Sequence, residues 1–158
     1  CHWALTLMDP VPPVLSEVAR ILAPGGCFAA LVDGPMDSAP GYRAVHDLIY
    51  DHVQAQLPAY GRVELGDPRV RDAEALAALV AETVPDAAIR CEPSVVTLQG
   101  PPAAVARDAA GFFYAGFVLS EAGRAAMLRD LSALLAKDAP AGVATFAMPV
   151  TRLVMTLR

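Results

Sequence analysis

The stretch Ile21-Leu22-Ala23-Pro24-Gly25-Gly26 joins two segments of different periodicity and decides the fold class. Before it, apolar residues recur at helical spacing: Val14, Leu15, Val18, Ile21 and Leu22. After it, residues 27–32 are continuously apolar, which is typical of a strand covered by helices on both faces. Proline fixes φ and glycine supplies a positive φ, so Ala23 to Gly26 is expected to form a type II turn. A helix, a tight turn and a buried strand in succession predict an α/β fold.

Capping and turn residues predict the other elements. Asp9 is expected to cap the first helix, with prolines in its first turn, and Asp72 and Ser120 are expected to cap later helices. Pro149 leaves open whether the terminal β-rich segment is one long strand or two short ones. The expected later helices cover residues 42–57, 73–84, 103–118 and 120–137, and the expected further strands cover residues 88–98 and 143–157.

Length and composition limit the class of protein. The 158 residues correspond to a single domain, and 55% hydrophobic with 18% charged residues is typical of a packed globular chain. The net charge is −5 and the 12 Lys and Arg residues are scattered, which argues against a nucleic-acid partner. No apolar run is long enough to span a bilayer, so no membrane association is expected. The three cysteines form no CxxC pair, which favours a reduced, cytoplasmic setting.

Two stretches, His2-Trp3-Ala4-Leu5 and the segment from Leu15 to Phe28, resemble the second half of a class I S-adenosylmethionine-dependent methyltransferase of the small-molecule branch. This family often has R-V-L-K-P-G-G before its fifth strand. The matching residues here are Arg20, Leu22, Pro24, Gly25 and Gly26. Over residues 43–142 the resemblance is one of element order.

The resemblance implies a partial Rossmann-like sheet, from the fourth strand onward, with helical lid-type insertions. It places these insertions at residues 34–68 and 101–141 of the single domain 1–158. It also implies S-adenosylmethionine as cofactor and a small organic molecule as methyl acceptor. Methyl transfer from a sulfonium needs alignment and exclusion of water more than a strong base. No triad or pair of carboxylates is evident, and the catalytic residues are left unassigned.

One feature of the family has no counterpart in the sequence. The glycine-rich E/D-x-G-x-G loop and the acidic residue that holds the ribose would lie before Cys1. We therefore expect this chain to be the C-terminal portion of a methyltransferase, unable to bind the cofactor well by itself. Its sheet would then have an unpaired edge, covered by the missing half or by a second copy in a homo-oligomer.

The resemblance assigns the first site residues near two strand ends. His2 and Trp3 match the segment that lies beside the methionine portion of the cofactor. The alternative is that Trp3 packs in the core and His2 faces solvent. Asp33 follows the apolar strand, where an acceptor would enter, and could take a proton or a hydrogen bond from it. As an alternative, Asp33 only caps the loop or faces water.

The other candidate acceptor-binding residues lie in the expected insertions. His46 and Tyr50 share one side of the helix expected over residues 42–57. The alternative is that this side is only a solvated polar face. Phe113 and Phe117 belong to an aromatic group expected on one helix, either as core residues or as the lining of an apolar acceptor pocket. His46 and His52 lie on different sides of the helix and lack a third ligand, so no metal site is expected.

Two other function classes remain open at this point. One is a noncatalytic half-domain that serves dimerisation or ligand sensing and never had a cofactor loop. The other is a different Rossmann-like enzyme, such as a dehydrogenase, which the helical insertion before the terminal strand disfavours.

Overall fold

The structure is a computed structural model that describes residues 1–61 and 66–158. Its described residues form two compact units, unit 1 with residues 1–38, 66–95 and 149–158, and unit 2 with residues 39–61 and 96–148. Two long strands contribute to both units. The expectation of a single domain with insertions at residues 34–68 and 101–141 stays a prediction, and residues 62–65 of the first insertion lie outside the described residues.

Unit 1 is an α/β unit in which short helices alternate with strands. It contains the ends of two strands that continue into unit 2, β2 (Ala87–Gly100) and β3 (Ala144–Leu157). Its own elements are the 3-10 helices η1 (Ala4–Leu7) and η2 (Pro68–Arg71), the helices α1 (Pro12–Ile21) and α3 (Ala73–Thr83), and the strand β1 (Cys27–Asp33). The terminal segment is thus one long strand, as the first of the two alternatives expected.

The sheet has the order β1-β3-β2, so the last strand in the sequence lies in the middle. β1 pairs with β3 in antiparallel fashion, from Cys27 opposite Thr156 to Asp33 opposite Val150. A parallel bridge joins His2 to Leu31 of β1, outside the regular strands. β1 therefore has β3 along one edge and the segment around His2 along part of the other.

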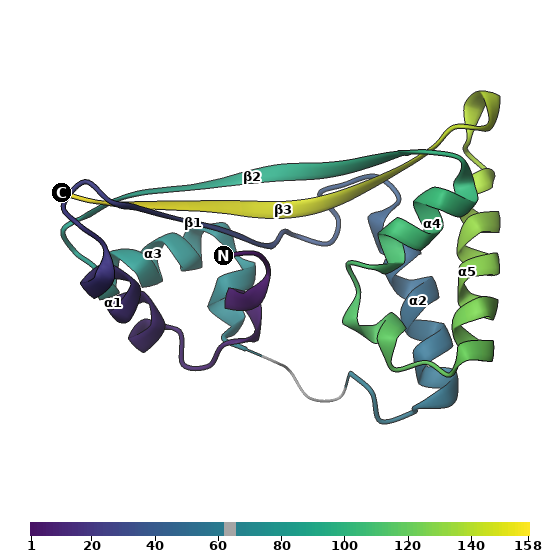
Figure 1. The fold of residues 1–158 in the computed structure, drawn as a ribbon, viewed down its shortest axis with the longest axis horizontal. Coiled ribbons are helices and arrows are strands. Elements are labelled where there is room, and N and C mark those ends of the chain that lie inside the picture. The colour runs from purple at the N-terminus through teal and green to yellow at the C-terminus, as the bar shows by residue number, and fades with distance from the viewer. Residues whose placement is uncertain (62–65) are drawn as a thin grey trace. The chain divides into compact units, whose positions relative to one another are not determined.

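Helices cover one face of the sheet in unit 1. Figure 1 shows α1 and α3 on the same side of β1, and Leu15, Leu79, Val80, Ala30 and Val32 pack together in the core there. On the other face, Cys27 and Ala29 are exposed and Leu31 is half-buried. Within the described residues, the expectation of helices on both faces of this strand is therefore wrong. A continuous apolar run also fits a strand covered on one face when its other residues are small.

The turn before β1 has the geometry that its residues predict. Gly26 N donates to Ala23 O at 2.7 Å, and Gly25 has a φ of +75°. The turn also joins the end of the sheet, because Gly25 N donates to Leu157 O and Leu157 N donates to Gly26 O. The turn therefore fixes the distance between α1 and the edge where β1 and β3 begin to pair.

Helix caps in unit 1 follow the sequence in part. Asp72 caps α3 by accepting from Ala75 N at 2.8 Å, as expected. Asp9 does not cap α1, so that expectation is wrong. The helix begins after Val11 without a side-chain cap, since Pro12 and Pro13 preset its first turn and bring no N–H that needs a partner.

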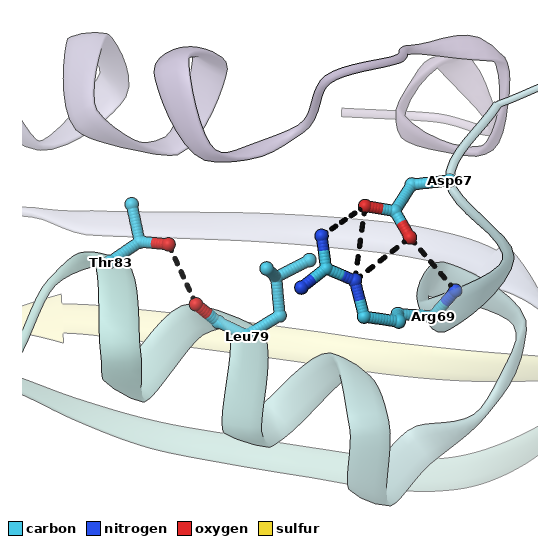
Figure 2. A network of polar contacts seen from close by, with 4 residues as sticks. All are labelled: Asp67, Arg69, Leu79 and Thr83. Carbon is cyan, nitrogen blue, oxygen red and sulfur yellow. Dashed lines mark hydrogen bonds and ion pairs between the residues drawn. The ribbon is translucent and has the colours of Figure 1, made fainter.

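The segment before α3 has a cap that sequence reasoning did not identify. Asp67 accepts from Arg69 N at 3.0 Å and also binds the Arg69 guanidinium, with the shortest contact at 2.6 Å to Nη2. Figure 2 shows this pair beside α3, where Thr83 Oγ1 donates to Leu79 O. The Asp67 carboxylate therefore orders the start of η2.

Unit 2 is helical, with the remaining parts of β2 and β3. Its helices are α2 (Tyr42–Gln56), α4 (Pro102–Ala110), α5 (Glu121–Ala136) and the 3-10 helices η3 (Tyr114–Phe117) and η4 (Pro140–Gly142). α5 packs against both α2 and α4, and the three lie side by side in Figure 1. Ser120 caps α5 through Gly123 N at 3.2 Å, as expected, and Ser120 N donates to Gln56 Oε1 of α2.

The helix expected over residues 103–118 is wrong in its second half. α4 ends at Ala110, and Gly111 N closes the last turn onto Asp108 O. Phe113 lies between helices, while Tyr114 and Phe117 belong to η3. Glycine is a poor helix former, and the helix ends there. Of the aromatic residues that follow, Phe113 is buried, whereas Tyr114 and Phe117 are largely exposed. Among the described residues, none of the helices combines the length and apolarity that crossing a bilayer requires.

Candidate functional site

The first candidate site is a pair of side chains, Trp3 and Asp33, in unit 1. Trp3 Nε1 donates a hydrogen bond to Asp33 Oδ1 at 2.9 Å. The segment of Trp3 runs parallel to β1, since Leu31 N donates to Cys1 O at 3.0 Å and Trp3 N donates to Leu31 O at 2.9 Å. Parallel segments end at the same edge of a sheet, which brings the two side chains together. In open α/β sheets, this edge is where ligands bind.

The Trp3 backbone adopts a conformation that non-glycine residues seldom adopt. Its φ is +51°, in the left-handed region. Thr6 Oγ1 donates to Trp3 O at 2.6 Å, and the His2 ring packs edge-on against the indole with centroids 5.1 Å apart. Such conformations persist only when the surroundings impose them, and they cluster at functional sites. The strained backbone of Trp3 therefore lies at the same sheet edge as its hydrogen bond to Asp33.

Asp33 is half-buried, and its environment changes its acidity. Burial raises the pKa of the Asp33 carboxyl, while the hydrogen bond from Trp3 and the positive charge of Arg71 act more weakly in the opposite direction. The loop that follows is held against β3, because Gly34 N donates to Pro149 O at 3.1 Å. Asp33 is therefore a partly desolvated carboxyl on a fixed backbone.

The second candidate site is an aromatic cluster in unit 2. His46 and Tyr50 stack on one side of α2 with ring centroids 4.3 Å apart. Phe113 lies edge-on to His46 at 6.1 Å, and Tyr42 stacks on Phe113 at 5.9 Å. Phe146 of β3 lies 6.1 Å from Tyr42. Tyr42, Phe113 and Phe146 are buried, whereas His46 and Tyr50 are partly exposed.

The structure thus brings some of the predicted site residues together and leaves others apart. His2, Trp3 and Asp33 meet in unit 1, and His46, Tyr50 and Phe113 meet in unit 2. Phe117 has a different environment: it is 57% exposed, and the Arg124 guanidinium lies 5.3 Å from the centre of its ring. The roles proposed for these residues stay predictions.

Sequence reasoning missed four residues that shape the two sites. Thr6 and Arg71 act on the first site, and Tyr42 and Phe146 complete the aromatic cluster. Tyr42 precedes His46 by four residues on the same helix, so helical spacing could have identified it. Thr6 follows Trp3 by only three residues, so a local turn could have identified it. Arg71 and Phe146 come from elements distant in sequence, and their positions depend on how the chain folds.

The histidines of unit 2 have single carboxylate partners. His46 Nδ1 lies 2.9 Å from Asp47 Oδ1, and His52 Nε2 lies 3.0 Å from Asp130 Oδ2. In the part of the chain that the structure describes, no group of three or more His, Cys, Asp or Glu side chains is placed to hold a metal ion.

Comparisons with known proteins give similarity at the level of structure alone. No protein-family model and no curated protein sequence matches this chain. A proposed methyltransferase from Bacillus halodurans is similar in structure with a TM-score of 0.46 and 11% sequence identity, over 99% of this chain. The YcgJ protein from Bacillus subtilis is similar with the same TM-score of 0.46 and 11% identity, over 100% of this chain. This chain spans 62% of the length of each of these two proteins.

Proposed function

We propose that this chain is the C-terminal portion of an S-adenosylmethionine-dependent methyltransferase that acts on a small organic acceptor in the cytoplasm. The observation that carries the proposal is the Trp3–Asp33 pair at the ends of two parallel segments, where an α/β sheet offers a ligand site. The sequence resemblance around Pro24-Gly25-Gly26 supplies the class of reaction. The ordered turn at these residues is consistent with their place in the resemblance.

The residues present fit one end of the proposed cofactor. S-adenosylmethionine carries a sulfonium and an ammonium group, and when bound it supplies an electrophilic methyl group. The faces of His2 and Trp3 and the carboxyl of Asp33 are the groups that attract such cations. Donors for the adenosine end would come from the glycine-rich loop, which the resemblance places before Cys1.

The acceptor would be bound by the remaining candidate residues. In unit 1 the candidate is Asp33, for a polar group of the acceptor. The candidates of unit 2, taken by themselves, are the aromatic cluster with His46, Tyr50 and Phe113, and Phe117 on η3, for an apolar group. Their contribution to catalysis would be alignment of acceptor and methyl group and exclusion of water. No residue is assigned as a general base.

The sheet edge of β1 supports the expectation of a further segment. The second edge of β1 is bonded by the first residues of the chain at Ala29 and Leu31, since Cys1 N donates to Ala29 O at 2.7 Å and Leu31 N donates to Cys1 O at 3.0 Å. Among the described residues no further bridge is found along this edge, and Cys27 and Ala29 are exposed on the uncovered face. Unpaired edges of this kind are usually covered. We propose that the segment with the glycine-rich loop covers this edge.

The test compares this chain with the product of its whole reading frame. We expect the intact mass of the longer product to exceed that of this chain. We also expect S-adenosylmethionine to release heat on binding to the longer product in calorimetry, and radiolabel from its methyl group to appear in a small acceptor. A reading frame that begins beside Cys1, or a longer product that binds no cofactor, would refute the proposal.

A noncatalytic half-domain is the second candidate, and the part of the β1 edge without a bridge among the described residues is the observation that favours it. In that case two copies would pair through this edge, and the chain alone would be a stable dimer. Sedimentation equilibrium of the 158-residue chain distinguishes the two. A dimer without any cofactor binding in the longer product would favour the half-domain.

A further inference from the structure

We infer that Asp33 is a positioning residue: its carboxyl fixes the indole ring of Trp3, so that the ring presents a set face to the cationic group of a ligand. The inference rests on the proposed function for the identity of that ligand, the sulfonium of S-adenosylmethionine. It also adds a second role for Asp33 to the contact with the acceptor that is proposed above.

The contacts of Trp3 carry this inference. Its backbone is held at both polar groups, by Leu31 O at 2.9 Å and by the Thr6 hydroxyl at 2.6 Å. These bonds fix the position of the Cα atom but leave the side-chain torsions to be set by other contacts. The bond from Nε1 to Asp33 Oδ1 at 2.9 Å is a polar contact of the ring itself, and it restrains these torsions. Trp3 remains partly exposed, so the ring is fixed without being removed from a ligand's reach.

The environment of Asp33 makes its bond to the indole a strong restraint. The carboxyl is half-buried, and a hydrogen bond in such surroundings is worth more than one in water. Its backbone is anchored too, since Asp33 pairs with Val150 of β3 and the next amide, Gly34 N, donates to Pro149 O at 3.1 Å. Asp33 thus transmits the rigidity of the sheet to the indole.

A fixed ring matters because a cation is attracted by the face of an aromatic ring and not by its edge. A ring that rotates freely would lose conformational entropy on binding, and a ring that is already fixed avoids that cost. A carboxylate at the indole N–H also adds negative charge near the ring. Substitution with asparagine separates the two effects, because Asn retains an acceptor oxygen and removes the charge.

The first test uses the fact that Trp3 is the one tryptophan of the 158 residues, so its indole N–H gives a single NMR resonance. In Asp33→Ala we expect this proton to exchange with water about tenfold faster, the loss that the removal of one hydrogen bond implies. In Asp33→Asn we expect exchange close to that of the parent chain. Asp86→Ala is the matched control, because Asp86 is exposed on a turn in the same unit. Equal exchange in Asp33→Ala and the parent chain would overturn the inference.

The second test measures binding by calorimetry on the longer product, with two probes: S-adenosylmethionine and its neutral thioether product, S-adenosylhomocysteine. We expect Asp33→Ala to weaken binding of the sulfonium about tenfold and that of the thioether less. Asp33→Asn is expected to restore most of the affinity. Trp3→Phe, which keeps a ring without the N–H, is expected to weaken sulfonium binding, and the double variant is expected to lose no more than Trp3→Phe alone.

The outcomes separate this inference from the proposed function. Equal losses of affinity in Asp33→Asn and Asp33→Ala would mean that Asp33 acts through its charge. Additive losses of affinity in Asp33→Ala and Trp3→Phe would mean that Asp33 acts independently of the ring. Either result would overturn the inference. If the parent protein binds both probes and Asp33→Ala does not weaken them, the inference fails while the proposed function stands. If the parent binds neither, the proposed function and the role toward the sulfonium both fail. If Asp33→Ala does not fold, Asp33→Asn and Trp3→Phe carry the comparison.

Discussion

Two aspartates of unit 1 have opposite environments and therefore opposite effects on stability with pH. Burial raises the pKa of Asp33, so the folded state binds its proton more tightly than the unfolded state does. The free energy of unfolding then falls as the pH rises from the ordinary aspartate pKa through the raised one. The bonds from Arg69 lower the pKa of Asp67, so its stabilisation is complete above the ordinary pKa and is lost as the pH falls through the lowered one.

We predict that Asp67→Asn lowers the free energy of unfolding at pH 7 by about 1 kcal/mol, because the capping oxygen is retained but the ion pair with Arg69 is lost. The variant should also lose stability less steeply than the parent chain between about pH 5 and pH 2. Urea denaturation across this range measures both. Asp86→Asn, at an exposed position, should follow the parent chain. Parallel pH profiles for Asp67→Asn and the parent chain would contradict the prediction.

Thr151 of β3 offers a second prediction at this scale. Its side chain is fully buried opposite Val32, and its hydroxyl has no hydrogen-bond partner among the residues that the structure describes. Valine has nearly the same shape and no polar group, so Thr151→Val should raise the free energy of unfolding by about 1 kcal/mol. Thermal denaturation measures the change, with Thr156→Val, at a partly exposed position on the same strand, as control. A lower melting temperature for Thr151→Val would show that the hydroxyl is bonded.

Among the elements, the turn at Ala23 to Gly26 uses its two glycines for different reasons. Gly25 needs its positive φ, but a Cβ there would meet no atom within 4 Å. At Gly26 a Cβ would lie 2.7 Å from Ala23 O, the acceptor of the turn's own hydrogen bond. The first glycine is required by the backbone conformation and the second by the space in the turn.

Substitution with alanine should therefore distinguish the two positions. Gly25→Ala is expected to lower the free energy of unfolding by about 1 kcal/mol, the cost of the left-handed conformation for a residue with a Cβ. Gly26→Ala is expected to lower it by about 3 kcal/mol, since the turn must open. Gly142→Ala, which combines a φ of +77° with open space, should match Gly25→Ala. Urea denaturation gives the order, and equal losses at positions 25 and 26 would contradict it.

The elements that depend on neighbouring residues could be predicted from the sequence, and those that depend on distant ones could not. The turn before β1 and the caps Asp72 and Ser120 involve residues within three positions of each other, and they are confirmed. The prediction that helices cover β1 on both faces was wrong. Whether the face with Cys27 and Ala29 is buried depends on distant residues that could pack on it. The capping role of Asp9 was wrong because prolines alone begin α1.

The candidate site shows the same division. Trp3 and Asp33 were predicted separately, from two strand ends, and their hydrogen bond depends on a parallel pairing that no local pattern reveals. Phe113 was expected on a helix and instead lies between helices, yet it joins His46 through packing. The sequence therefore identified candidate residues for each site, whereas the contacts between them depend on the fold.

At the scale of the whole molecule, the chain has two cores. Unit 1 packs Leu15 and Leu79 of its helices against Leu153 and Met155 of β3, and unit 2 buries Ile49, Met127 and Leu131 of its own helices. Each unit buries large residues completely. We infer from the separate cores that local opening of one unit leaves the other closed.

We predict that Leu15→Ala and Ile49→Ala each lower the free energy of unfolding by about 2 to 5 kcal/mol, since both side chains are fully buried. Hydrogen exchange should show that Leu15→Ala reduces the protection of α3 amides and leaves α5 amides unchanged. Ile49→Ala should have the reverse effect. The two substitutions serve as controls for each other, and equal loss of protection in both units would contradict two separately opening cores.

The middle position of β3 has a consequence for synthesis on the ribosome. Cys27 of β1 can pair with Thr156 only after β3 has been synthesised, because β3 lies between β1 and β2 but is the last of the three strands to be made. At the usual rate of translation this delay is on the order of ten seconds. Throughout it, β1 and β2 leave the ribosome without their common partner, so a nascent chain would depend on chaperones, or on the pairing of its β1 edge, to stay free of aggregation.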